Sequence, residues 1–488
     1  MVALYRQDMK KVNTKKQFQQ AAYINGKFIT DRKTFDVINP ATGDSIASVP
    51  DLTAADCKKA IDHAHEAWQA WRSTEVTQRS RTVRKWYDLI IAHKQELART
   101  MTMESGKPLS ESLAEVDYGA SFVEWYAEEA KRAYGETIPA PKAGQRFVTI
   151  RQPVGVVAAI TPWNFPLAMI TRKVAPALAS GCTVVLRPAS QTPLTAVAVA
   201  RLAHEAGFPA GVFNVVTGKD SKGMGEELTT NKLVRKISFT GSTEVGRTLM
   251  ANAAGTIKKV SFELGGNAPF LVFGDADIDA AVAGAITAKF RNSGQTCVAV
   301  NRFYVQDEVF DTFAKKLTTA VKKLKVGNGL DDGVQVGPLI SAEGLIKVKN
   351  HVKDAIEKGA TLRTGGKAKT GLFYQPTVLA DVDPSALIAR EETFGPICAL
   401  FRFKTEEEGI ARANDTEFGL AAYFYSSNVN RCWRVAEQLE SGMVGINTGL
   451  VSNAAAPFGG VKQSGIGREG SKHGLDDYTE IKYLCFNE

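Results

Sequence analysis

The chain has 488 residues, which is too long for one ordinary hydrophobic core, so we expect two or three structural units. Its 44% hydrophobic and 23% charged residues are typical of a soluble globular protein, and no apolar run approaches the about 18 residues that span a membrane. The net charge of +8 is scattered and not interleaved with aromatic residues, so it predicts no nucleic-acid partner; a dinucleotide phosphate explains it equally simply.

The N-terminus and the cysteines predict a cytoplasmic protein without a metal site. Residues 1–20 form a short basic tail that lacks the apolar core of a secretion signal and is too poor in Arg and Ser to support a transit peptide. The six cysteines are widely spaced and contain no CxxC pair. This pattern indicates a reducing compartment, with no disulfide framework and no structural zinc.

The predicted elements, in chain order, begin with a helix-rich region over residues 54–130. A regular alternation of short apolar runs and amphipathic stretches follows. It predicts strands at 154–160, 183–186, 212–216, 236–240 and 260–264, and helices at 166–179, 193–206 and 243–253. After Leu264-Gly265-Gly266, which reads as a hinge, it predicts a helix at 276–291, a strand at 302–306 and a helix at 309–324. Such repeated units predict an α/β fold with doubly wound parallel sheets covered by helices on both faces.

Two stretches lie outside this alternation. Residues 135–151 and 478–486 read as exposed strands, which invite pairing with another chain. We interpret them as an oligomerisation element. The predicted domains are a cofactor-binding domain (21–130 and 152–262), a catalytic domain (263–470) and the oligomerisation element (131–151 and 471–488).

Two glycine motifs compete for a dinucleotide phosphate. Residues 465–470 match GxGxxG literally, but no predicted strand precedes them and too little chain follows for a βαβ unit, so we predict a simple turn. Residues 239–246 (FTGSTEVG) follow a predicted strand and open a predicted helix. Backbone N–H groups near Gly241, Ser242 and Gly246 can therefore face a pyrophosphate. The structural alternative is a βα turn that needs glycine only for a positive φ.

Arg187 and Ser190 follow the strand at 183–186, at the edge of the sheet where ligands bind. A carboxylate there would accept the ribose hydroxyls of NAD and repel a 2′-phosphate. Ser190 cannot repel it and Arg187 would attract it, so NADP is the preferred cofactor and NAD remains possible. The structural alternative is a surface arginine followed by a serine that caps a helix.

A thiol, a carboxylate and an amide form the candidate reaction centre. Cys297 follows the polar run SGQT, so we expect it on a loop rather than as a buried small hydrophobe. Glu263 lies beside Phe262, and burial there would raise the pKa of Glu263, as suits a general base. The alternative is that Glu263 is an exposed carboxylate at the end of a strand. Asn164 is either an oxyanion donor or a cap for the helix after it.

Six motifs, in this order along the chain, carry a resemblance to a known family: PWNFP, FTGSTEVG, FELGGN, FRNSGQTC, EETFGP and PFGG. Together they resemble the aldehyde dehydrogenase superfamily from about residue 20 to the C-terminus. Within it, the chain is most similar to the NADP-preferring bacterial succinate-semialdehyde dehydrogenases. The resemblance implies a cofactor domain, a catalytic domain and an oligomerisation hairpin, assembled as a homodimer or homotetramer. It also implies a step in the degradation of γ-aminobutyrate (GABA).

The resemblance also implies a mechanism. The Cys297 thiolate attacks the aldehyde, the Asn164 amide and the backbone N–H of Cys297 hold the oxyanion, and hydride transfer to the nicotinamide leaves a thioester. Glu263 then activates water for hydrolysis, which argues against a rival that releases acyl-CoA. Further roles are carried over with the family: Lys173 near the reaction centre, Glu469 as a proton-relay carboxylate, Glu392 and Phe394 on the nicotinamide ribose and ring, and Thr161, Pro162, Trp163 and Leu264 along the cofactor groove.

The chain departs from the family pattern at two positions. Arg187 stands where the family usually has a lysine on the adenosine ribose, and arginine is bulkier and can bind phosphate bidentately. Ala299 stands where some relatives carry a second cysteine, so a disulfide switch between these positions is impossible.

Two arginines and a serine predict the substrate. Arg172 follows Asn164 on the predicted helix and Arg291 precedes Cys297 by six residues, so both suit a substrate with a distal carboxylate. Ser452 resembles a third carboxylate contact of the semialdehyde enzymes. The alternatives are a solvated helix face for Arg172 and a cation at a helix C-terminus for Arg291.

The predicted reaction is oxidation of succinate semialdehyde. Glutarate semialdehyde, one methylene longer, stays an alternative because a methylene discriminates by only about 1–3 kcal/mol. A broader aldehyde dehydrogenase is a second alternative, and a non-catalytic protein with the same fold, used structurally or for binding, is a third. The intact set of Cys297, Glu263 and Asn164 argues against the last.

Overall fold

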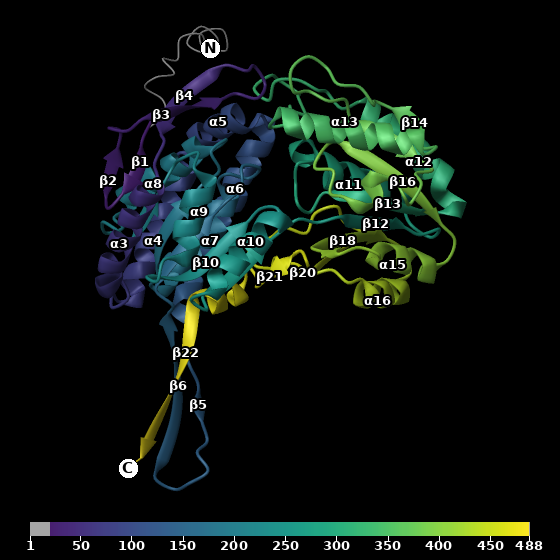
Figure 1. Cartoon of the computed structure of the whole chain (residues 1–488). Coiled ribbons are helices and arrows are strands. Elements are labelled where there is room, and N and C mark those ends of the chain that lie inside the picture. Colours follow the sequence, from purple (N-terminus) through teal and green to yellow (C-terminus); the bar gives the residue numbers. More distant parts are fainter. Residues whose placement is uncertain (1–19, 488) are drawn as a thin grey trace, which may run out of the picture.

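The computed structural model describes residues 20–487, so the basic tail predicted over residues 1–20 lies outside this part apart from Gln20. Figure 1 shows two lobes side by side, and a long antiparallel sheet that projects away from them. No helix in the described part is long and apolar enough to cross a membrane.

The first lobe is built on an eight-stranded sheet with the order β2-β1-β9-β8-β7-β10-β11-β21. Its strands are β1 (Ala22–Ile24), β2 (Lys27–Ile29), β7 (Val156–Ile160), β8 (Thr183–Arg187), β9 (Phe213–Val215), β10 (Val234–Thr240), β11 (Lys259–Glu263) and β21 (Gly465–Ile466). The five central strands run parallel, as predicted, and antiparallel strands close both edges. Along β7, Val157 and Ala159 join one hydrophobic core while Val156 and Ala158 join another, so both faces of the sheet are buried.

Helices cover both faces of this sheet. They are α3 (Ala54–Trp71), α4 (Val76–Ala92), α5 (Lys94–Ser105), α6 (Leu109–Glu129), α7 (Ala168–Ser180), α8 (Pro193–Ala206), α9 (Ser221–Thr230) and α10 (Thr243–Ala254). The predicted helix at 193–206 has the bounds of α8, since Pro193 starts it and Gly207 ends it with a φ of +97°. Helix α9 was not predicted, because Gly223 and Gly225 obscure its amphipathic pattern.

The second lobe is built on a seven-stranded sheet with the order β14-β15-β16-β13-β12-β18-β19. Its strands are β12 (Ala268–Val272), β13 (Val300–Gln306), β14 (Thr361–Thr364), β15 (Thr377–Ala380), β16 (Ile397–Phe403), β18 (Ala421–Tyr425) and β19 (Met443–Ile446). Its main helices are α11 (Ile278–Phe290), α12 (Asp307–Lys322), α13 (Ala342–Glu357), α15 (Glu406–Asn414) and α16 (Val429–Gln438). Strand β12 was not predicted because Pro269 argues against a central strand; the register with β13 shifts at this proline.

The projecting sheet joins the two segments predicted to lie outside the alternation. Strand β22 (Thr479–Asn487) pairs along its whole length with β6 (Gln145–Pro153), which also pairs with β5 (Thr137–Ile138). The predicted strands are therefore present, but they pair first with each other, and β22 remains an edge strand of the described sheet. The side chains of Ile481 and Tyr483 on this strand are 66% and 54% exposed.

The segment 465–470 behaves as a turn, as predicted for the rejected GxGxxG match. Gly465, Gly467 and Gly470 all have positive φ, and no α-helix follows them in the described chain. One detail differs, because Gly465 and Ile466 form β21 against β11 of the first sheet.

The division into three domains stays a prediction. The hinge Leu264-Gly265-Gly266 lies between the last parallel strand of the first sheet and β12 of the second.

Candidate active site

The turn that carries Cys297 is built from an unusual run of backbone conformations. Cys297 lies between the end of α11 and the start of β13, on a loop as predicted. Before it, Asn292, Ser293 and Gly294 have φ of 50°, 58° and 76°. Non-glycine residues adopt such values only where surrounding contacts enforce them. At Gly294 a Cβ would lie 2.3 Å from the carbonyl oxygen of Gly395, so only glycine fits there.

Hydrogen bonds hold this strained run in place. The backbone N–H of Asn292 donates to Glu111 (2.6 Å), and its side-chain amide donates to the carbonyl of Asn164 (3.0 Å). The hydroxyl of Ser293 donates to the carbonyl of Gly337 (3.0 Å). The loop of the nucleophile is thus tied to both lobes before any ligand binds.

Asn164 lies against this loop. Its Nδ2 donates to the carbonyl of Gln295 (3.0 Å), and its Oδ1 is buried without a partner in the described structure. The amide retains a second N–H. The alternative that Asn164 caps the following helix is wrong, because α7 begins at Ala168 and receives no side-chain cap.

A cavity of about 230 Å³ brings together nine of the predicted site residues, among them Cys297 and Asn164. At one wall, the rings of Trp163 and Phe394 meet edge to face at 5.6 Å. The lining residues are Pro162, Trp163, Asn164, Thr240, Gly241, Ser242, Leu264, Gly265, Cys297, Glu392 and Phe394. Sequence reasoning missed Thr240, although its place at the end of a predicted strand was the available signal.

The βα turn at this cavity is shaped by crowding rather than by a positive φ. Ser242 caps α10 by accepting from the N–H of Val245 (3.4 Å). Gly241 has no positive φ, which contradicts the structural alternative; instead, a Cβ there would lie 2.3 Å from the ring of Phe239. A Cβ on Gly246 would lie 2.5 Å from Leu264. The residues of this turn that line the cavity, Gly241 and Ser242, are small.

Polar groups near this turn are left without protein partners. The hydroxyls of Thr161 and Thr240, at the carboxyl ends of β7 and β10, are buried and make no hydrogen bond in the described chain. Glu392 accepts from the N–H of Gly266 (3.2 Å), and burial raises its pKa to about 7. Orphaned hydroxyls and a nearby carboxyl fit a nucleotide ligand with ribose hydroxyls and phosphates.

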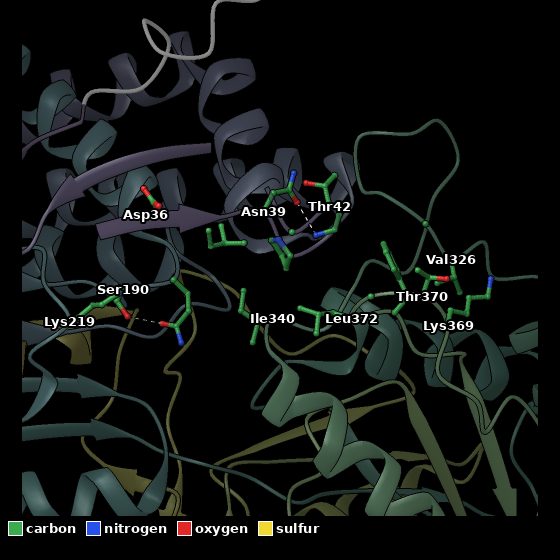
Figure 2. A pocket seen from close by; sticks show the side chains of 18 residues that line it. Asp36, Asn39, Thr42, Ser190, Lys219, Val326, Ile340, Lys369, Thr370 and Leu372 are labelled. Carbon is green, nitrogen blue, oxygen red and sulfur yellow. Dashed lines mark hydrogen bonds between the residues drawn. The ribbon is translucent and has the colours of Figure 1, made fainter. Parts of the chain in front are cut away.

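Arg187 and Ser190 do not share one cavity wall. Arg187 is 8% exposed and donates through Nη2 to the hydroxyl of Ser221 (2.7 Å), so it is not the surface arginine of the alternative. Ser190 lines a second cavity of about 620 Å³ beside Lys219, as Figure 2 shows at its left edge. The capping alternative for Ser190 is wrong, because Thr192 is the N-cap of α8. Sequence reasoning missed Lys219, and nothing in its neighbourhood marked it.

Glu263 ends β11 with both carboxylate oxygens buried and unpartnered in the described structure. Burial, and next the negative charge of Glu469, raise its pKa well above the ordinary value, against the opposing charges of Arg172 and Lys173. The expectation of a raised pKa is confirmed, and the exposed-strand alternative is wrong. The shift favours the protonated carboxyl over the carboxylate.

The thiol of Cys297 is also held in its neutral form. Burial raises the pKa of Cys297 to about 12; Arg172 and Arg291 oppose this increase, while Glu392 and Glu263 add to it. The two arginines predicted for the substrate are thus the cations that favour the thiolate.

Three charged residues lie buried behind Cys297. Arg172 and Lys173, both on α7, each form an ion pair with Glu469. Burial would raise the pKa of Glu469, but the two cations outweigh it and hold this pKa below the ordinary value. Arg172 is 1% exposed, so the alternative of a solvated helix face is wrong.

Arg291 and Ser452 reach the same region from other directions. The guanidinium of Arg291 lies 5.1 Å from the ring centre of Phe165. Arg291 directly follows α11, so it also fits the alternative of a cation at a helix C-terminus. Ser452 lines a separate cavity of about 940 Å³ together with Tyr118. Burial raises the pKa of Tyr118, while the charges of Arg172 and Arg291 and the nearby donor groups of Arg172 and Ser452 lower it. Tyr118 therefore links the three predicted substrate residues, and no sequence signal marked it.

Comparisons with known proteins agree with this geometry. A profile of the aldehyde dehydrogenase family matches residues 28–484. The chain belongs to the aldehyde dehydrogenase family. The glutarate-semialdehyde dehydrogenase of Pseudomonas putida is 59% identical over 472 residues, which are 96% of this chain and 98% of the relative.

Further relatives of this aldehyde dehydrogenase come from Escherichia coli. The NADP(+) succinate-semialdehyde dehydrogenase of strain K12 is 58% identical and covers 97% of this chain and 99% of its own. A crystal structure of an E. coli NADP-dependent enzyme has a TM-score of 0.96 at 58% identity, over 98% of this chain and all of its own. The predicted fold class and family are therefore confirmed.

The cysteines of this aldehyde dehydrogenase differ sharply in environment. Cys57, Cys182 and Cys398 are buried, Cys432 is half-buried and Cys485 is exposed. Cys297 is the cysteine that lines the 230 Å³ cavity. Ala299 is 5% exposed and offers no second thiol beside it, and no cluster of metal-binding side chains occurs among residues 20–487.

Proposed function

We propose that this aldehyde dehydrogenase oxidises succinate semialdehyde to succinate with NADP as the preferred cofactor. The observation that carries the proposal is Arg172, whose buried Nη1 and Nη2 have no hydrogen-bond partner in the described chain. Its charge acts on both Cys297 and Glu263. A buried guanidinium with free N–H groups beside a nucleophile suits a substrate that brings its own carboxylate.

The protein residues divide the reaction into two parts. The Cys297 thiol loses its proton and its sulfur bonds to the aldehyde carbon, while the free N–H of Asn164 and the backbone N–H of Cys297 stabilise the oxyanion. A bound nicotinamide cofactor would supply the hydride acceptor. Glu263, once ionised, takes a proton from water, which attacks the Cys297 thioester and releases the acid. The charges of Lys173 and Glu469 act on Glu263, and these two residues can relay the proton that Glu263 takes up.

The 230 Å³ cavity supports binding of the nicotinamide half of the cofactor. Glu392 would accept hydrogen bonds from the ribose hydroxyls. The nicotinamide ring would be enclosed by Trp163, Pro162, Leu264 and Phe394. The N-terminus of α10, with Gly241, Ser242 and Gly246, would face the phosphates. Thr161 and Thr240 supply orphaned hydroxyls. Arg187, Ser190 and Lys219 are the candidates for the adenosine end, with no carboxylate among them to repel a 2′-phosphate.

Replacing Ser190 by glutamate is expected to shift the preference from NADP towards NAD. The new carboxylate would repel the 2′-phosphate and accept ribose hydroxyls. Lys219→Ala is expected to raise KM for NADP about tenfold while changing that for NAD little, since a charge-assisted hydrogen bond contributes about 1.5–3 kcal/mol. Steady-state kinetics with both cofactors measure the ratio. An unchanged ratio in both variants would contradict this placement of the ribose.

The substrate prediction is tested with four aldehydes: succinate semialdehyde, glutarate semialdehyde, butanal and an aldehyde that ends in a sulfonate. Arg172→Gln and Arg291→Gln are expected to raise KM for the semialdehydes at least about tenfold, and for butanal far less, because only the former lose a charge-assisted hydrogen bond. Arg363→Gln, at an exposed position on β14, is the control.

Equal losses for charged and uncharged aldehydes would contradict carboxylate recognition. A lower KM for the sulfonate or the glutarate compound than for succinate semialdehyde would support the anion-binding site but assign a different substrate to it. No activity of the parent with any of the four would favour the non-catalytic alternative.

Several predictions about the whole protein remain part of this proposal. The exposed edge of β22 supports a homodimer or homotetramer assembled through the projecting sheet. The unpaired cysteines support a cytoplasmic location, and the substrate would place the enzyme in degradation of GABA. We also propose the three domains with the boundaries given above.

A further inference from the structure

The guanidinium of Arg172 is held on two sides. Glu469 forms an ion pair with Nε. The ring of Phe458 lies against the guanidinium, with 4.4 Å between its centre and Cζ. A cation held over an aromatic face away from water is bound more strongly than one at the surface.

Phe458 and Glu469 belong to one backbone unit. The N–H of Phe458 donates to the carbonyl of Glu469 (2.7 Å), and the N–H of Glu469 donates to the carbonyl of Phe458 (2.8 Å). Both residues are buried, at 3% and 2% exposure. The aromatic contact and the ion pair are therefore fixed relative to each other by two backbone hydrogen bonds.

Lys173 fixes the rotation of the Glu469 carboxylate. Its Nζ donates to Oε1, which leaves Oε2 for Arg172. With Nε paired and one face covered, the terminal edge of the Arg172 guanidinium is what remains for a ligand. Its Nη1 and Nη2 form no hydrogen bond or ion pair in the described chain, and together they match the two oxygens of a carboxylate.

We propose that Phe458 and Glu469 form a clamp that orients Arg172 towards the carboxylate end of the substrate. Both are positioning residues, and Glu469 thereby serves substrate recognition in addition to any transfer of protons from Glu263. The inference rests on the proposed semialdehyde function. It adds two residues that serve this function by positioning Arg172, without touching the substrate carboxylate themselves.

The test compares Glu469→Gln and Phe458→Leu with the parent, using succinate semialdehyde and butanal. Glutamine keeps the shape of the side chain but cannot pair with two cations at once. We expect Glu469→Gln to raise KM for succinate semialdehyde at least about tenfold, which corresponds to the loss of one oriented charge-assisted hydrogen bond. The KM for butanal should rise no more than about threefold. Phe458→Leu should act in the same direction, and Phe458→Tyr, which keeps the ring, should restore the parent KM.

A second readout does not depend on chemistry. The inhibition constant of succinate should rise in Glu469→Gln and Phe458→Leu, while that of butanamide, which has no carboxylate, should not. Glu406→Gln, which removes the partner of Arg431 and Arg434 on the second lobe, is the matched control for loss of a shared carboxylate.

The outcomes separate the clamp from the proposed function. A parent without preference for the semialdehyde over butanal overturns the proposed function and the clamp with it. A parent with that preference, whose Glu469→Gln variant loses kcat equally for both aldehydes at unchanged KM, overturns the clamp alone and leaves Glu469 as a proton relay. If Glu469→Gln does not fold, Phe458→Leu decides: an unchanged KM for succinate semialdehyde overturns the clamp.

Discussion

Replacing Glu263 by glutamine is expected to allow one oxidation and nearly stop the next. Cys297, Asn164 and the cofactor cavity stay intact in this variant, so the thioester forms at close to the parent rate. Glutamine cannot take a proton from water, and a positioned general base contributes about 10²–10⁴-fold. The acyl enzyme should therefore accumulate.

Rapid mixing with succinate semialdehyde measures this directly. The Glu263→Gln variant should release a burst of reduced cofactor close to one per active site, followed by a steady rate reduced about 10²–10⁴-fold. Cys297→Ala is the control and should give neither burst nor turnover. A Glu263→Gln variant without a burst would mean that Glu263 acts before hydride transfer, which contradicts the assigned order.

The same residue sets a pH dependence. Burial raises the pKa of Glu263, so the fraction in the carboxylate form, which acts as the base, increases as pH rises through that pKa. Where hydrolysis limits the rate, kcat of the parent should rise with pH through the raised pKa. The slow steady rate of Glu263→Gln should lack this ascending limb.

Local sequence signals predicted those elements in which propensity and packing agree. Helix α8 starts at a proline and is followed by a glycine, and β7 is an uninterrupted apolar run, so both were predicted close to their observed bounds. Helix α9 contains two glycines and β12 a proline, and both form because tertiary packing overrides these local signals.

The candidate site divides in the same way. Cys297, Glu263 and Asn164 lie beside turn residues at the ends of elements, and motifs identified them. The ion pair between Arg172 and Glu469 joins positions almost 300 residues apart, which no periodicity reveals. Tyr118 and Lys219 reach their cavities only through the packing of α6 and the loop after β9. Burial of Arg187 likewise depends on that loop, because Ser221 receives its hydrogen bond.

The largest effect on stability is expected at a buried ion pair beneath the oxyanion residue. Lys107 and Glu115 pair at 2.5 Å with side chains almost completely buried, and Lys107 also donates to the carbonyl of Asn164 (2.6 Å). The other oxygen of Glu115 accepts from the N–H groups of Leu167 (2.9 Å) and Ala168 (3.2 Å) at the start of α7. One carboxylate thus joins α6, the start of α7 and the loop of Asn164.

Glu115→Ala is expected to lower the free energy of unfolding by about 3–5 kcal/mol, because it leaves Lys107 as an uncompensated buried charge. Asp117→Asn is the matched control, since Asp117, also on α6, forms an exposed pair with Lys94 on α5, and such pairs contribute about 0–1 kcal/mol. Denaturation followed by circular dichroism compares the two. Similar losses in both variants would contradict a structural role for the buried pair.

A double variant separates stability from catalysis. Replacing both charges, as in Lys107→Met with Glu115→Leu, removes the unpaired cation, so part of the lost stability should return. The carbonyl of Asn164 would still lack its donor and the start of α7 its acceptor. We therefore expect kcat to stay at least about tenfold below the parent, given that loss of one oxyanion donor costs about 10²–10³-fold. Full recovery of kcat together with stability would show that Lys107 and Glu115 only keep the fold and do not position Asn164.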